Sequence, residues 1–233
     1  MLQVRNLVAR YGEFQALFGI DFDLKQGSIV ALIGANGAGK STFLKSIAGQ
    51  MPNKSGEIRF NSEEISSLPP DRIVRDGISM VPEGRRLFRS LSVEENLKVG
   101  SFAGREGRWT LEAIYTLFPQ LKDKRHVPAT ALSGGQQQMV ALGRGLMSNP
   151  DLLMCDEVSL GLSPSVIKDI YKVFPQIRAE GLSLVVVEQD IDAALRISDY
   201  LYCFMHGKVT LHGAPSELTK EQISAAYFGL ETA

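Results

Sequence analysis

The 233-residue sequence contains few cysteines, no long apolar run and almost no excess charge. Its two cysteines, Cys155 and Cys203, have apolar neighbours, which predicts buried thiols in a reducing compartment rather than a disulfide framework. No stretch approaches the roughly 20 apolar residues of a membrane-spanning helix, and residues 1–7 lack the apolar block of a secretory signal. We therefore expect a cytosolic protein that would act at a membrane only through a partner protein.

Charge and composition narrow the classes of function. Lysines and arginines number 25 against 26 aspartates and glutamates, which gives a formal net charge of −1. This balance leaves no broad basic field of the kind that non-specific nucleic-acid binding needs, so we expect no nucleic-acid partner. A hydrophobic content of 44% and a charged content of 22% are ordinary for a globular protein.

Two patterns of apolar residues predict two kinds of sheet. The runs Ile29–Ile33, Leu152–Cys155 and Leu184–Val187 are continuous and apolar, as in parallel strands that are covered on both faces. The segments Leu2–Leu7 and Phe22–Leu24 alternate apolar and polar side chains, which predicts a small antiparallel sheet. The sequence thus predicts an α/β fold with a mostly parallel central sheet.

Helical patterns occupy the middle of the chain. Residues 111–118 carry apolar side chains at helical spacing before Pro119, and residues 136–147 form another helical stretch that ends before Asn149 and Pro150. No internal repeat, low-complexity tract or linker separates independent domains. We expect one folding unit, residues 1–233, with a core and β subdomain at about 1–83 and 150–233 and a helical subdomain at about 84–149.

A glycine-rich segment follows the first continuous run. Residues 34–42 match the full phosphate-loop pattern and lie between the strand that ends at Ile33 and a predicted helix over residues 43–47. In this pattern, backbone N–H groups and the helix N-terminus bind phosphate oxygens, Lys40 is expected to reach the outer phosphates, and Ser41 can ligate Mg²⁺. A plain glycine-rich turn is the alternative, and it does not explain the lysine, the hydroxyl and the flanking elements together. The candidate nucleotide-binding residues of this loop are Gly34, Asn36, Gly37, Ala38, Gly39, Lys40, Ser41 and Thr42.

Two acids end the second continuous run. Asp156 and Glu157 follow the strand at Leu152–Cys155, and open α/β sheets place their ligands at the carboxyl ends of such strands. Asp156 is a candidate Mg²⁺ ligand, and Glu157 is placed to polarise the water that attacks the terminal phosphate. Taken alone the two acids would be ordinary loop residues, and the phosphate loop makes that alternative the weaker one.

The segment Leu132–Gln136 has the sequence LSGGQ and precedes a predicted helix. It lies about twenty residues before the strand that ends in the two acids. Alone it would read as a helix cap, because Ser133 is a good first residue for a helix. In this context it resembles the signature of ATP-binding cassette (ABC) proteins, and the resemblance covers essentially the whole chain. It implies a P-loop NTPase (RecA-like) core, a small antiparallel β subdomain and a helical subdomain that carries the signature.

The resemblance also implies a dimer. In that family two cassettes pack head to tail, and the signature of one, here Ser133, Gly134, Gly135 and Gln136, closes over the nucleotide held by the other. Tyr11 is at the position where the family stacks an aromatic ring on adenine, with a core tyrosine as the alternative. Ser159–Leu162 resembles the loop that reaches across the dimer, although a plain turn before Pro164 explains it equally well.

Two positions depart from the family pattern. Glu83 occupies the place of a glutamine that ligates magnesium and senses the membrane subunit, and a carboxylate is also a competent ligand. Gln189 occupies the place of a switch histidine. An amide donates a hydrogen bond but cannot carry the charge of imidazolium, so weaker hydrolysis, or hydrolysis dependent on a partner cassette, is expected. The candidate catalytic residues are Glu157, Gln189 and Lys40. His126, His206 and His212 are expected to be surface residues.

These departures, with Leu91–Leu97 and Ala226–Gly229, are similar to the cassettes of branched-chain amino-acid importers. That resemblance implies a heterodimer with a second cassette, two membrane-spanning permease subunits, an external substrate-binding protein, and a place on the inner face of the cell membrane. Urea and amide importers are close relatives. Two alternatives from other classes stay open: a soluble ATP-dependent clamp, and a nucleotide-gated binding module with negligible turnover.

Overall fold

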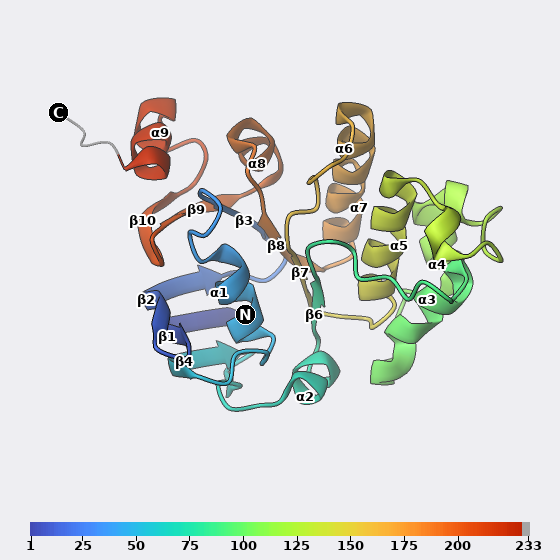
Figure 1. The fold of residues 1–233 in the computed structure, drawn as a ribbon, viewed down its shortest axis with the longest axis horizontal. Helices are drawn as coiled ribbons and strands as arrows, with labels where there is room; N and C mark the ends of the chain where they lie inside the picture. Colours follow the sequence, from blue (N-terminus) through green and yellow to red (C-terminus); the bar gives the residue numbers. More distant parts are fainter. Residues whose placement is uncertain (230–233) are drawn as a thin grey trace.

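A six-stranded sheet forms the centre of the computed structural model, which describes residues 1–229 (Figure 1). The strand order is β10-β9-β3-β8-β7-β6, with every neighbouring pair parallel except β9 and β10. The strands are β3 (Ile29–Ile33), β6 (Ile78–Val81), β7 (Leu152–Cys155), β8 (Ser183–Val187), β9 (Tyr200–Met205) and β10 (Lys208–Gly213). The side chains of β3, β7 and β8 are entirely buried, which explains their continuous apolar sequences.

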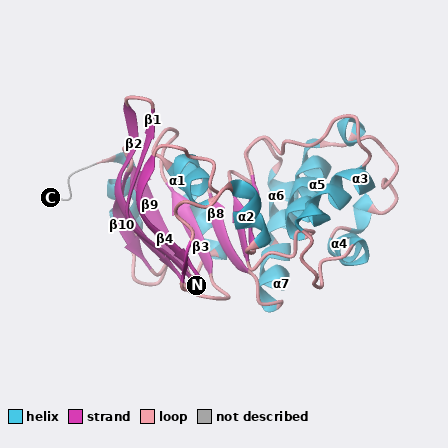
Figure 2. Ribbon diagram, turned by 90° about the horizontal axis from the view of Figure 1, so that it is seen from below, coloured by secondary structure: helices cyan, strands magenta, loops and turns pink. Residues whose placement is uncertain are grey.

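A second sheet is antiparallel and has the order β2-β1-β4-β5 (Figure 2). Its strands are β1 (Leu2–Tyr11), β2 (Phe14–Leu24), β4 (Lys54–Phe60) and β5 (Glu63–Glu64). Buried and exposed residues alternate along much of β1 and β2, because only one face of this sheet covers the core. Helix α1 (Lys40–Ile47) packs between the two sheets and shares one apolar core with both.

Further helices pack on the central sheet or on one another. They are α2 (Pro70–Arg75), α3 (Val93–Gly100), α4 (Leu111–Leu117), α5 (Gly134–Leu146), α6 (Pro164–Tyr171), α7 (Val173–Ala179), α8 (Ile191–Ile197) and α9 (Lys220–Phe228). Three short 3₁₀ turns lie at Ser101–Ala103, Pro119–Leu121 and Ala129–Ala131. Figures 1 and 2 both show α3, α4 and α5 together at the end of the molecule farthest from the antiparallel sheet.

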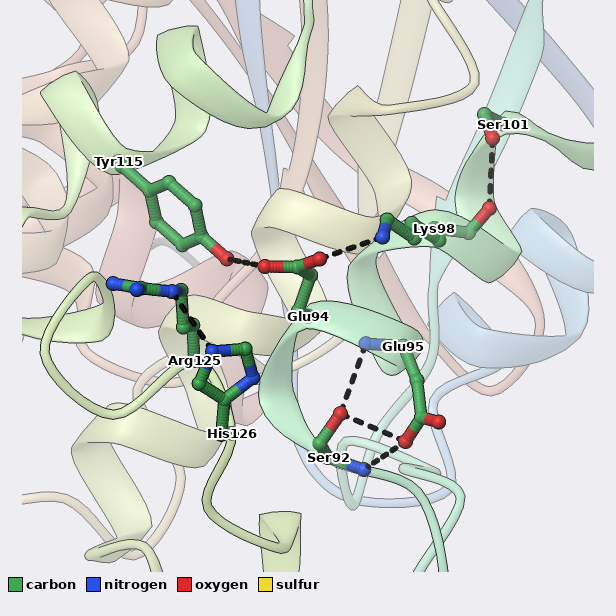
Figure 3. Close-up of polar contacts among 8 residues, drawn as sticks. All are labelled: Ser92, Glu94, Glu95, Lys98, Ser101, Tyr115, Arg125 and His126. Atoms are coloured by element: carbon green, nitrogen blue, oxygen red, sulfur yellow. Dashed lines mark hydrogen bonds and ion pairs between the residues drawn. The ribbon is translucent and has the colours of Figure 1, made fainter.

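Polar contacts fix helix α3 within this helical end (Figure 3). Ser92 and Glu95 cap each other's backbone N–H groups at the first turn, with donor–acceptor distances of 2.8 and 3.3 Å. Glu94 forms an ion pair with Lys98 on the next turn and accepts a 3.4 Å hydrogen bond from the Tyr115 hydroxyl of α4. Burial, and then the charge of Glu94, raise the pKa of Tyr115 to about 12. The hydroxyl therefore stays a donor at neutral pH.

The predicted α/β fold is confirmed, with differences at element ends and in the linking strands. Helix α5 begins at Gly134 rather than Gln136, because Ser133 caps it. Strands β4 and β6 were not predicted, since β4 alternates only weakly and β6 has only four residues. Both cysteines are buried and free. Within residues 1–229 no helix is long and apolar enough to cross a bilayer. The last four residues of the expected unit lie outside the described part of the chain.

Phe43 of α1 joins the two sheets, and its removal should destabilise the protein strongly. Its ring is fully buried and lies 5.1 Å from that of Phe22 and 5.4 Å from that of Phe204. We expect Phe43→Ala to lower the free energy of unfolding by about 3–5 kcal/mol, because it leaves a cavity. Urea-induced unfolding measures the change. Phe102→Ala is the control: its ring is 87% exposed, and a loss as large as that of Phe43→Ala would contradict the assignment.

Candidate active site

The phosphate loop runs from the end of β3 into α1 and is held by close backbone packing. Gly34 has a φ of +147°, and a Cβ there would lie 2.2 Å from the carbonyl oxygen of Phe204. Gly39 precedes α1 with a φ of +106°, and a Cβ there would lie 2.8 Å from a methyl carbon of Leu17. Side chains other than hydrogen are therefore excluded at both positions. The loop is wedged between β2 and β9.

Lys40 is the first residue of α1 and is buried beneath this loop, with an exposed fraction of 4%. Its ammonium group donates to the carbonyl oxygens of Gly34 and Ala35, at 2.6 and 3.0 Å. Burial lowers the pKa of Lys40, and the carboxylates of Glu157 and Asp156 oppose that shift. The ammonium thus stands inside the loop with acids nearby, as a phosphate-binding lysine requires.

Asp156 follows β7 and faces the same loop. Its backbone N–H donates to Val81 at 2.9 Å, and its carboxylate accepts a 3.0 Å hydrogen bond from the Ser41 hydroxyl. Burial raises the pKa of Asp156, the bond from Ser41 opposes this, and the charges of Glu157 and Glu83 add to the rise. Glu83 itself is exposed. A hydroxyl and a carboxylate at this distance, with a second carboxylate nearby, form an oxygen donor set that suits Mg²⁺.

Glu157 and Gln189 are in direct contact. Glu157 has a left-handed backbone with a φ of +50°, which is uncommon for a residue with a side chain. The amide nitrogen of Gln189, just after β8, donates to the carboxylate of Glu157 and to the side-chain oxygen of Asn36, both at 2.9 Å. The amide therefore bridges the candidate base and the phosphate loop. A neutral histidine has only one ring N–H to donate.

A cavity of about 470 Å³ opens beside the loop. Tyr11 lines it, with its hydroxyl 3.4 Å from that of Thr42, and 48% of the tyrosine is exposed, so the core alternative for Tyr11 is wrong. The lining also includes Phe14, Phe18 and His206, which were not predicted as site residues. The two phenylalanines are exposed on a strand with alternating burial, and this alternation was the signal that could have found them.

His206 was expected to be an ordinary surface residue. It is exposed, but it lies in the turn between β9 and β10 and lines the cavity. The neighbouring Gly207 ties this turn to the site: its N–H donates to Ala38 of the loop, and its carbonyl accepts from Phe18, both at 2.9 Å. This turn is far from the phosphate loop in the sequence. The parallel pairing of β3 and β9 brings the turn and the loop together.

The signature segment begins α5. Ser133 accepts a hydrogen bond from the backbone N–H of Gln136 at 3.3 Å, and the side chain of Gln136 accepts from the N–H of Ser133 at 3.2 Å. A Cβ on Gly135 would lie 2.5 Å from Val166 of α6, so only glycine fits there. Among the described residues, the lining of the loop cavity does not include Ser133–Gln136. Within one chain, the structure therefore does not bring the signature to the phosphate loop.

Together these residues form a site for phosphate-ester chemistry. The loop offers inward N–H groups and a buried ammonium for phosphate oxygens. Glu157 offers a carboxylate that can accept a proton from water. The cavity beside them has exposed aromatic rings for a flat base.

Comparisons with known proteins agree with this geometry. The family model "ABC transporter" matches residues 17–159. The high-affinity branched-chain amino acid transport ATP-binding protein BraG of Pseudomonas aeruginosa is 42% identical over 98% of this chain and 100% of its own. A solved ATP-binding cassette of an ABC transporter in its ADP conformation is similar at 27% identity, with a TM-score of 0.81 over 97% of this chain and 93% of that one.

A dimeric bacterial ABC transporter cassette also has this fold, at 25% identity and a TM-score of 0.80, over 92% of this chain and 99% of that one. The family model covers more than half of the sequence, and BraG matches nearly all of it. The chain therefore belongs to the ABC transporter family, as one of its ATP-hydrolysing cassettes.

Proposed function

We propose that ATP is bound and hydrolysed between the phosphate loop and the acids that follow β7. The loop and Lys40 bind the polyphosphate, Tyr11 stacks on adenine, and Glu157 accepts the proton of the attacking water. The convergence of Lys40, Asp156 and Glu157 at one end of the central sheet carries this proposal: Lys40 and Glu157 line the same cavity, and Asp156 accepts a hydrogen bond from Ser41, which also lines it. Charged groups this close are typical of phosphoryl-transfer sites.

Mg²⁺ is the second part of the proposal. Ser41, Asp156 and Glu83 are the residues that would hold it, and the ion would neutralise charge on the β- and γ-phosphates when bound. The 3.0 Å contact between the Ser41 hydroxyl and the Asp156 carboxylate supports this, and burial together with the charges of Glu157 and Glu83 raises the pKa of Asp156. A hard divalent ion would offset these negative charges.

Gln189 has a distinct role in this proposal. Its amide holds the Glu157 carboxylate and Asn36 at once, and it does not titrate in the physiological range. We infer that Gln189 orients the base and the loop, without contributing the positive charge of a protonated histidine. Hydrolysis continues, with less stabilisation of charge on the terminal phosphate.

The signature segment acts on a second cassette. Ser133–Gln136 lie outside the cavity of their own chain, and the helix they begin lies apart from α1 in Figures 1 and 2. A relative that was solved as a dimer supports pairing of two cassettes. In our proposal the pair is head to tail, and each signature covers the partner's nucleotide. The subgroup resemblance favours a second, different cassette as the partner.

A cleft beside the helical end supports docking of a membrane-spanning permease subunit. Its volume is about 450 Å³, and it lies between α2, β6, the end of α3 and α5. Phe88, Val99 and Phe102 line it and are 49%, 39% and 87% exposed. An exposed apolar cluster in a concave surface is typical of a protein interface. We propose that residues 84–149 form the helical subdomain that passes movement to this interface.

The cargo and the place of action are proposals from relatives. BraG is named for branched-chain amino acid transport, so we propose uptake of hydrophobic amino acids through two permease subunits, fed by an external binding protein. The cassette would then lie in the cytoplasm, on the inner face of the cell membrane. Urea or amide uptake is the nearest alternative, and a clamp without permease partners is the more distant one.

Glu157→Gln should separate ATP binding from hydrolysis. Loss of the general base should lower phosphate release by about 10²–10⁴-fold, while the affinity for MgATP stays and a nucleotide-bound dimer accumulates. Phosphate release and size-exclusion chromatography with MgATP measure both effects, and Glu63→Gln on exposed β5 is the control. Equal inertness of the unaltered chain and Glu157→Gln would instead favour a nucleotide-gated module.

Phe102→Glu should weaken capture of membrane subunits. Replacing this exposed ring with a carboxylate removes apolar contact area at the proposed interface, so fewer permease subunits should co-purify from detergent-solubilised membranes. ATP-dependent dimer formation in detergent-free buffer should stay unchanged. Phe228→Glu is the matched control, since this ring is 68% exposed but lies on α9, outside the cleft. Undiminished co-purification with Phe102→Glu would remove the docking proposal.

A further inference from the structure

A buried carboxyl group lies directly beneath the active site and has no role in the chemistry described so far. Glu188 is fully buried at the end of β8, next to Gln189. Its backbone N–H donates to Leu32 of β3 at 3.0 Å, so its main chain is fixed to the strand that leads into the phosphate loop. Burying a carboxyl group is costly unless it is paired, and no lysine, arginine or histidine pairs with it among residues 1–229.

One hydrogen bond connects Glu188 to the loop after Glu157. The Ser159 hydroxyl donates to Oε2 of Glu188 at 2.6 Å. Ser159 is two residues after Glu157, and this loop turns tightly, with the N–H of Leu160 donating to the carbonyl of Glu157 at 3.3 Å. The short distance and the buried acceptor make this a strong contact.

The two loops are thus joined twice. Gln189 donates to Glu157 on the cavity side, and Ser159 donates to Glu188 on the core side. These two hydrogen bonds and the backbone form a closed ring. Glu157 and Ser159 lie in the loop after β7, and Glu188 and Gln189 lie at the end of β8. A ring with one bond at the core and one at the cavity fixes the rotation of the Glu157 loop, which a single bond would leave free.

The other oxygen of Glu188 faces Tyr171 of α6. Within the described chain, Oε1 of Glu188 and the Tyr171 hydroxyl are both buried and lack hydrogen-bond partners. They are close enough that burial first, and then the charge of Glu188, raise the pKa of Tyr171. Burial likewise raises the pKa of Glu188, and the hydrogen bond from Ser159 opposes that rise. An underused polar pair is a cost in stability, which natural sequences keep mainly where a site needs it.

We propose that Glu188 is a positioning residue, which holds the Glu157 loop through Ser159 so that the Glu157 carboxylate stays within reach of Gln189. The inference rests on the role proposed for Glu157. It adds that the orientation of the base is set from the core, through a carboxyl group that is fully buried.

A double-mutant cycle tests this proposal on the full chain. Ser159→Ala and Glu188→Ala should each lower kcat for ATP hydrolysis by about tenfold or more, because a displaced base is a weak catalyst. The double variant should be no slower than the slower single variant, because both remove the same bond. KM for ATP should stay within about twofold throughout. Circular dichroism and thermal melting establish that each variant is folded.

Conservative variants separate positioning from packing. Glu188→Gln keeps an acceptor oxygen for Ser159, and Ser159→Thr keeps the donor hydroxyl, so each should recover most of the kcat lost in the alanine variant. In the Glu157→Gln background, Ser159→Ala should leave ATP-dependent dimer formation unchanged. The Ser159 variants still test the proposal if Glu188→Ala does not fold.

Three results would overturn the proposal: losses in kcat that multiply in the double variant, a kcat of Ser159→Ala equal to that of the unaltered chain, or dimer formation abolished by Ser159→Ala. The activity of Glu157→Gln tests the role of Glu157 separately. If Glu157→Gln is inactive and the coupling is absent, only the role of Glu188 fails. If Glu157→Gln stays active, the proposed base itself is wrong.

Discussion

Close backbone packing between the phosphate loop and the turn after β9 is the constraint on which the rest of the site depends. Gly34 fits against the carbonyl of Phe204, and Gly207 donates to Ala38 of the loop. Behind this contact the rings of Phe43 and Phe204 pack 5.4 Å apart. The loop is therefore supported from the core before any phosphate arrives, and its N–H groups need little reordering to bind one.

Electrostatics around the loop follow from that support. Lys40 is buried with its ammonium bonded to loop carbonyls, and Asp156 and Glu157 face it from the end of β7. Burial raises the pKa of Asp156, and the charge of Glu157 adds to that rise. In the proposed complex, the negative polyphosphate would lie against the ammonium of Lys40, and the divalent ion would lie against the acids. In the proposed function, the same groups then serve both nucleotide binding and hydrolysis.

The sequence located the phosphate loop and the buried strands, but it did not show which residues from distant parts of the chain lie beside them. The phosphate loop and the strands around it were predictable, because buried parallel strands are continuous and apolar and the loop pattern is specific. The cavity residues Phe18 and His206 were not, because they depend on which strand lies beside β3. Gln189 was identified as a departure, but its bridge between Glu157 and Asn36 depends on side-chain geometry that no spacing encodes. The contact between Glu188 and Ser159 likewise depends on side-chain geometry.

Binding and hydrolysis of MgATP by Lys40→Ala is the measurement that tests the central claim most directly. Titration calorimetry and phosphate release should both show a severe loss, because the ammonium inside the loop is gone. Lys25→Ala, which removes an exposed lysine from the turn before β3, should behave as the unaltered chain does. If Lys40→Ala binds and cleaves ATP as well as the unaltered protein, the phosphate loop is not the nucleotide site and the account is contradicted.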